Sequence, residues 1–184
     1  MDFRTITSFK NINIIPKTLV FCDIDETVLK YKDIDAKWWL DKIDYHYSKV
    51  KNYKHANDMA YSEWKDIVYR HRPEHTDATG FETMVKNIYN LGGELVFITA
   101  RQNDLEDLTI EHLRHVLNRD FLVKFCGDEP KGIVINNMPI DRSGYNRVLF
   151  IDDNERHLKS VYNVFGDQFI YYRFDMEGKN IDEL

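Results

Sequence analysis

The stretch TLVFCDIDET, residues 18–27, places two carboxylates directly after an apolar run. Its first five residues are apolar or β-branched, which is typical of a strand buried in a parallel sheet. Side chains two positions apart on a strand point to the same side, so Asp23 and Asp25 should reach the strand end together. In open α/β sheets, functional sites lie beyond the carboxyl ends of the strands. We therefore expect a site at this pair, although a plain turn with Asx hydrogen bonds is the alternative.

The rest of the chain alternates between apolar runs and segments of helical periodicity. Strands are predicted at residues 18–23, 94–99, 121–125, 147–152 and 168–173. Helices are predicted around 81–88, 105–116 and 158–165, with Asn103 as the N-cap of the second and Gly166 ending the third. This alternation predicts βαβ units and an α/β fold with a central parallel sheet and helices on both faces.

Four short segments together resemble the motifs of the haloacid dehalogenase (HAD) superfamily, a group dominated by phosphatases. Residues 23–27 have the Asp-x-Asp-x-Thr form of its first motif. Residues 98–101 (ITAR) are similar to the second, residues 130–132 (PKG) to the third, and residues 150–154 (FIDDN) to the acidic fourth motif. The resemblance runs from about residue 17 to about residue 174. It implies a Rossmann-like three-layer sandwich, formed by a single domain over residues 1–184 with a small helical cap inserted after the first motif.

The resemblance also implies roles for individual residues. Asp23 would be the nucleophile that forms an aspartyl-phosphate, and Asp25 the general acid and then the general base. Thr99 and Lys131 would bind the phosphoryl oxygens, and Lys131 would also keep Asp23 ionised.

A Mg²⁺ site is implied as the cofactor site. Its ligands would be the carboxylates of Asp23 and Asp152 and the backbone carbonyl of Asp25, a set of hard oxygen donors. Asp153 would lie just outside, binding through water or orienting Lys131.

Several of these assignments have alternatives in the sequence. Residues 99–101 are also compatible with an ordinary helix-entry loop, and Arg101 either reaches the substrate or pairs with a nearby carboxylate. Lys124 competes with Lys131, but it lies within a predicted strand. The stretch INNMP, residues 135–139, is a poor helix and departs from a regular third motif.

The interval between residues 30 and 79 is too long for a simple strand-to-helix loop. Two amphipathic patterns predict two helices in it, which would form the cap. Trp39, Arg72 and His75 are candidate substrate contacts, although such tryptophans more often pack an insert against the core. Because the catalytic candidates lie outside it, we expect this segment to govern substrate choice more than chemical power.

The composition fits a cytoplasmic globular enzyme. The net charge of −6 argues against a general nucleic-acid-binding surface. Cys22 and Cys126 read as buried thiols rather than a disulfide. The chain shows no signal peptide or transmembrane segment, and we interpret the C-terminal IDEL, residues 181–184, as coincidence rather than a retrieval signal.

The leading functional hypothesis is a Mg²⁺-dependent phosphomonoester hydrolase. Its substrate would be a phosphorylated small molecule or a nucleotide, with a nucleic-acid end as a further option and no membrane partner. The alternatives are a phosphotransferase that uses the same intermediate and a HAD-fold binding or regulatory protein without turnover. The sequence does not specify the oligomeric state.

Overall fold

A six-stranded parallel sheet forms the centre of the computed structural model, which describes residues 3–176. The strand order is β1-β8-β7-β2-β5-β6, and every neighbouring pair is parallel. The strands are β1 Arg4–Ile6, β2 Thr18–Cys22, β5 Glu94–Thr99, β6 Leu122–Phe125, β7 Arg147–Asp152 and β8 Ile170–Phe174. The five strands predicted from the sequence are present, and β1 adds a short edge strand.

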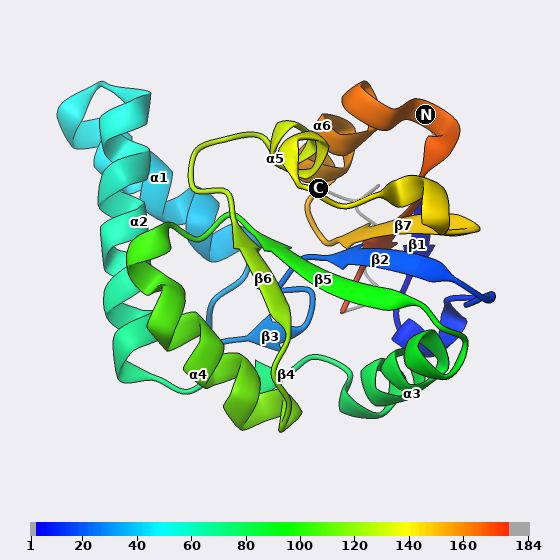
Figure 1. Cartoon of the computed structure of the whole chain (residues 1–184). Coiled ribbons are helices and arrows are strands. Elements are labelled where there is room, and N and C mark those ends of the chain that lie inside the picture. Colours follow the sequence, from blue (N-terminus) through cyan, green and yellow to red (C-terminus); the bar gives the residue numbers. More distant parts are fainter. Residues whose placement is uncertain (1–2, 177–184) are drawn as a thin grey trace.

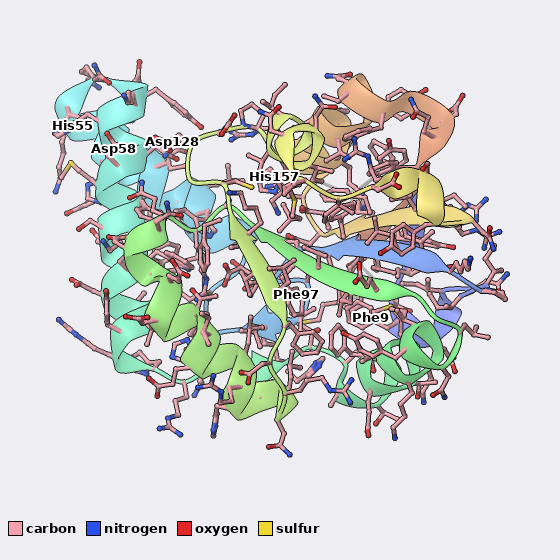
Figure 2. The ribbon with its side chains drawn as sticks, in the orientation of Figure 1. Phe9, His55, Asp58, Phe97, Asp128 and His157 are labelled. Carbon is pink, nitrogen blue, oxygen red and sulfur yellow. The ribbon has the colours of Figure 1, made fainter. Side chains whose placement is uncertain are left out.

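Helices cover both faces of this sheet, as Figure 1 shows. The helices α3 Ala78–Asn90 and α4 Glu106–Leu117 cover one face, and α5 Lys131–Asn137 and α6 Glu155–Phe165 cover the other. Alternate residues of the buried strands feed two cores: Val20 packs on the α3 side, whereas Phe21 packs on the α6 side. Figure 2 shows Phe9 and Phe97 on the α3 side. The predicted three-layer α/β architecture is confirmed.

The register of the central strands positions the candidate site. β2 lies between β5 and β7, and Cys22 is level with both Phe97 and Ile151. The backbone N–H of Asp23 donates to the carbonyl of Ile151 at 2.9 Å, which extends the pairing one residue past β2. The carboxyl ends of β2, β5 and β7 therefore form one edge, which carries Asp23, Thr99 and Asp152.

The long interval after β2 forms two helices, as predicted. A two-stranded antiparallel ladder, β3 Leu29–Lys30 with β4 Glu74–His75, brings the two ends of this segment together. Between them lie α1 Ala36–Val50 and α2 Tyr53–Arg70, which pack side by side (Figure 1). The short connection uses Lys51 in the left-handed region (φ 51°) and Asn52 as the N-cap of α2.

The inserted helices pack through clusters of their own rather than through the sheet cores. One cluster combines Tyr31 and Trp64 with Leu105 from the turn before α4. A smaller cluster joins Ile43 to alanines of α2. The insert is therefore attached to the sandwich mainly through the chain that follows β5.

Two local expectations were wrong. Asn103 does not cap α4, because a 3-10 turn, Asn103–Leu105, comes first and α4 begins at Glu106. The stretch INNMP was expected to be a poor helix, but its first three residues form the end of α5. The apolar residues Val134 and Ile135 of this helix are buried, and this tertiary packing outweighs the low helix propensity. Further 3-10 turns are Phe9–Asn11, Arg142–Gly144 and Gly166–Gln168.

Both cysteines are free thiols, as predicted, with Cys22 buried and Cys126 partly buried. Within residues 3–176, no helix has the length and apolar character needed to cross a bilayer. The C-terminal IDEL lies outside the described residues.

Candidate active site

Lys131 stands at the centre of a buried ion cluster. It is the first residue of α5 and is 2% exposed. Its Nζ donates to Oδ1 of Asp23 and, at 2.7 Å, to Oδ2 of Asp152. Burial alone would lower the pKa of Lys131, but Asp152 and Asp23 outweigh burial and raise it. The lysine is therefore a fixed positive charge between two carboxylates.

The two carboxylates differ in their surroundings. Burial and the charge of Asp152 raise the pKa of Asp23 to about 6, against the opposing effect of Lys131. Asp152 is also buried, yet Lys131 and His157 lower its pKa. Its Oδ1 accepts the backbone N–H of Asn154 at 2.9 Å and lies 3.3 Å from Nδ1 of His157, which Figure 2 labels on α6. Lys131 and His157 thus favour the ionised form of Asp152.

Thr27 joins the first carboxylate motif to the last. Its hydroxyl lies 3.3 Å from Oδ2 of Asp23 and 3.3 Å from Oδ1 of Asp153, and it accepts the backbone N–H of Asp153 at 3.1 Å. The hydroxyl has one proton to donate, so it serves one of the two carboxylates at a time. This fully buried residue braces the loop after Asp23.

Three carboxylates converge on one point that suits a hard cation. Oxygen atoms of Asp23, Asp152 and Asp153 all lie within 4.8 Å of one another. Burial, followed by the charges of Asp152 and Asp23, raises the pKa of Asp153 well above its ordinary value. A divalent cation with a preference for oxygen ligands would relieve this repulsion, so the donor set fits Mg²⁺. The geometry also makes Asp153 a candidate direct ligand, where the sequence had suggested an outer position.

Asp25 belongs to a second, partly buried ion pair beside this cluster. Arg101 follows β5 and is 1% exposed. Its Nε donates to Oδ2 of Asp25 at 2.9 Å and its Nη2 donates to Oδ1 at 2.7 Å. Of the two roles left open for Arg101, the structure shows the pairing with a carboxylate. Thr99 lies next to this pair, fully buried, and accepts the backbone N–H of Arg101 at 3.1 Å, which leaves its own hydroxyl proton to donate.

The structure separates the two lysine candidates. Lys131 contacts Asp23, whereas Lys124 is exposed on the edge strand β6. Lys124 instead lines a polar cavity of about 410 Å³ together with residues 102–103 and 125–129. This cavity begins one residue beyond Arg101.

The remaining candidates lie among other partners. The Trp39 ring packs 5.8 Å from the ring of Trp64, as expected for an aromatic that fixes the insert. Arg72 is exposed and faces Glu111 at 3.9 Å. Nδ1 of His75 accepts the backbone N–H of Asp77 at 3.0 Å, and burial lowers the pKa of His75 to about 4. Their roles as substrate contacts stay predictions.

Fold and site together define an α/β protein in which a buried lysine joins two carboxylates at the carboxyl edge of a parallel sheet. Its particular family is the one described as "Protein of unknown function (DUF2608)", whose model matches residues 5–121; the chain belongs to that family. The matched residues include Asp23, Asp25 and Arg101, whereas Lys131 and Asp152 follow them.

Three solved structures are similar to this chain. One is a class C acid phosphatase from Bacillus anthracis, with 20% identity, a TM-score of 0.46, and coverage of 88% of this chain and 68% of the other. Another structure, of class C acid phosphatase from the same organism with tungstate bound, has 18% identity, a TM-score of 0.48, and coverage of 95% and 78%. The HAD domain of effector protein Lem4 from Legionella pneumophila has 13% identity, a TM-score of 0.46, and coverage of 91% and 90%. No curated protein matches the chain.

Proposed function

We propose that this protein is a Mg²⁺-dependent phosphomonoester hydrolase of the HAD type that acts through a phospho-Asp23 intermediate. One observation carries the proposal: Lys131 joins Asp23 to Asp152 in a buried cluster. Lys131 and Asp23 lie 108 positions apart in the sequence. A buried Asp–Lys–Asp cluster is costly to maintain for stability alone, because desolvation offsets much of the ionic attraction. Clusters of this kind are common at functional sites.

The residues can divide the reaction as follows. A carboxylate oxygen of Asp23 attacks phosphorus, and the bond from phosphorus to the ester oxygen breaks. Asp25 gives its proton to that leaving oxygen. Lys131 and the Thr99 hydroxyl donate to the phosphoryl oxygens. Water then attacks the phospho-Asp23, Asp25 takes the proton of that water, and inorganic phosphate leaves with Asp23 restored.

Asp23, Asp152 and Asp153, with the backbone carbonyl of Asp25, would hold the cation. When bound, Mg²⁺ supplies positive charge that offsets the phosphate oxygens. Lys131 occupies the same neighbourhood in the structure, so the lysine and the cation would share the neutralisation of the three carboxylates.

Residues 30–79 would be a small helical cap over this edge. Support comes from contacts between α2 and the chain after β5: the backbone N–H of Gln102 donates to the Tyr61 hydroxyl at 3.2 Å, and Lys65 pairs with Asp104. The polar cavity beyond Arg101 would receive the leaving group, which favours a hydrophilic substrate such as a phosphorylated metabolite or nucleotide over an apolar one.

The direct test measures hydrolysis of an aryl phosphate with and without Mg²⁺ and traps the phosphoenzyme by rapid acid quench. Asp23→Asn should abolish both turnover and the trapped phosphoenzyme. Asp120→Asn is the matched control, because Asp120 is exposed and pairs with Arg114 away from the site. An added alcohol acceptor separates hydrolysis from phosphoryl transfer. Absence of turnover across aryl phosphates, nucleotides and sugar phosphates would favour a non-catalytic protein.

A further inference from the structure

Four hydrogen bonds hold the guanidinium of Arg101. An arginine has five N–H donors. Nε and Nη2 donate to the two oxygens of Asp25, Nη1 donates to the Thr109 hydroxyl at 3.0 Å, and Nη2 also donates to the Tyr31 hydroxyl at 3.0 Å. Thr109 and Tyr31 are themselves buried. A bidentate pair fixes the plane of the carboxylate as well as its distance.

Aromatic rings of the inserted segment enclose the same guanidinium. Its central carbon lies 5.4 Å from the ring centre of Trp64, on α2, and 6.0 Å from that of Tyr31. Both distances fall within the range of cation–π attraction. Tyr31 and Trp64 belong to residues 30–79, so the insert contributes the rings and one acceptor that hold Arg101.

Tyr31 is anchored from its far side. Its hydroxyl accepts from Arg101 and lies 2.9 Å from Nδ1 of His112 on α4. A neutral His112 whose Nδ1 carries no proton would accept the hydroxyl proton of Tyr31. Burial, followed by the charge of Arg101, lowers the pKa of His112 to about 4, in agreement with a neutral ring. A continuous chain of contacts therefore runs from α4 through Tyr31 and Arg101 to Asp25.

We propose that Arg101, aligned by Tyr31 and Trp64 of the inserted segment, is a positioning residue that holds the Asp25 carboxylate in place for proton transfer. The inference rests on the proposed function. A carboxylate offers about four acceptor positions and Arg101 fills two, so the other positions of Asp25 stay open to the leaving oxygen and to the attacking water. Arg101 stays charged throughout. The insert thereby contributes to the rate of the reaction, beyond the substrate choice that the sequence suggests for it.

Exposure and geometry favour positioning over direct substrate binding. The Arg101 side chain is fully buried, whereas the side chain of Asp25 keeps 26% of its surface exposed. Asp25 is therefore the member of the pair that an incoming ester oxygen can reach. A displacement of about 1 Å in a reacting group can cost on the order of 100-fold in rate, so fixing this carboxylate matters.

The test uses two variants that keep size and polarity close to the parent. Arg101→Lys keeps the charge but loses the paired, planar donors. Tyr31→Phe removes one oxygen from the insert's contact with Arg101 and is the variant less disruptive to folding. Arg114→Lys, on the exposed face of α4, is the matched control. Thermal unfolding is recorded for each variant beside kcat and KM.

For an alkyl phosphate, Arg101→Lys should lower kcat on the order of 100-fold, with KM changing less than about threefold. Tyr31→Phe should lower kcat by a smaller factor, about threefold to tenfold. An activated aryl phosphate needs less acid assistance, so its single-turnover phosphorylation should fall less than that of the alkyl phosphate. Arg114→Lys should match the parent.

The outcomes separate the inference from the function beneath it. A parent protein that hydrolyses alkyl phosphates, with folded variants that keep its kcat, overturns the inference and leaves the proposed function standing. A change confined to KM, or equal losses for alkyl and aryl substrates, also overturns it, because Arg101 would then act on substrate binding or globally. If Arg101→Lys does not fold, Tyr31→Phe decides. A parent without turnover overturns the function and the inference with it.

Discussion

Two buried cations lie at the same edge of the sheet, and they are held in different ways. Lys131 contacts Asp23 and Asp152, all within the α/β sandwich. Arg101 contacts Asp25 on the sandwich but also Tyr31 and Trp64 of the inserted segment. Both cations are almost fully buried. The first centre is complete without the insert, whereas the second is complete only with it.

This difference indicates that the two steps of the proposed chemistry depend on separate groups of contacts. Attack on phosphorus and neutralisation of its charge depend on the sheet and the start of α5. Proton transfer at Asp25 depends on how α1 and α2 pack against the chain after β5. A substitution in one centre should therefore leave the properties of the other centre measurable.

The largest effect is expected from Lys131→Met. Removing one partner of a buried ion cluster typically costs about 3–5 kcal/mol, because the remaining charges stay buried without compensation. Asp23 and Asp152 would be left facing each other, so the free energy of unfolding should fall by about that amount and turnover should disappear. Denaturant unfolding and a turnover assay measure both.

Lys124→Met is the matched control for the stability of that variant, since Lys124 is exposed on β6. Its effect should be within about 0.5 kcal/mol, as is usual for surface positions. A Lys131→Met protein as stable as Lys124→Met would break the comparison, because the Lys131 centre would then carry no buried charge that needs balancing.

The second prediction assigns the cation to the Lys131 centre. A ligand at 100 times its Kd stabilises a protein by about 2.7 kcal/mol, so saturating Mg²⁺ should raise the Tm of the parent. Asp152→Asn should lose this response, because it removes a charged ligand from the group of three carboxylates. Asp25→Asn should keep the response, because the Asp25 side chain belongs to the Arg101 centre. Loss of the Mg²⁺ response in both variants would contradict this assignment, because the Asp25 side chain would then also belong to the cation site.

The third prediction concerns the far end of the Arg101 centre. The pKa of His112 is lowered from 6.5 to about 4 in the folded protein, so between these pH values the unfolded chain binds more protons. Stability from this group is therefore complete above pH 6.5 and is lost as the pH falls toward 4. His112→Gln should flatten the pH dependence of unfolding in that window.

His115→Gln, exposed one helical turn further along α4, is the control and should leave the slope as it is. His75 has a similarly lowered pKa and keeps its own contribution in both variants. Parallel curves for the parent and His112→Gln would show that burial and the charge of Arg101 do not hold His112 neutral.

The smallest effect is expected at the turn between α1 and α2. Lys51 holds a left-handed conformation, with φ at 51°. A non-glycine residue in that region costs roughly 1 kcal/mol, so Lys51→Gly should stabilise the protein by up to about that amount. Turnover should not change, since the turn lies away from both centres. Stabilisation accompanied by an altered kcat would mean that mobility of the helix pair limits the reaction.

The sandwich and the Lys131 centre could be predicted from the sequence because each follows from a local pattern. Apolar runs that end in acidic or hydroxyl residues define strand ends, and parallel strands bring those ends to one edge. β1, β3 and β4 were not predicted because two or three residues carry no periodicity. α5 was underestimated because the burial of Val134 and Ile135 depends on tertiary packing.

Only part of the Arg101 centre could be predicted from the sequence. Arg101 had two open roles in the sequence, and nothing local distinguishes them. Its partners Asp25, Tyr31 and Thr109 belong to separate segments, and their meeting depends on how the insert folds back onto the chain after β5. Tyr31 and His112 carried no motif at all; His112 offered only the signal of a polar group in the apolar pattern of a predicted helix, and Tyr31 lies between two lysines.

The pairing of β2 with β7 has a consequence for how the protein folds during its synthesis. Thr27 and Asp153, which hydrogen-bond beside that pairing, lie 126 positions apart in the chain. Asp23 and Asp25 therefore leave the ribosome long before Lys131 and Asp152 do. Closing so large a loop carries an entropic cost that makes the central pairing a late and slow event in folding. A nascent chain holds Asp23, the proposed nucleophile, without its counter-charge, so the proposed activity should arise abruptly, when the last strands dock.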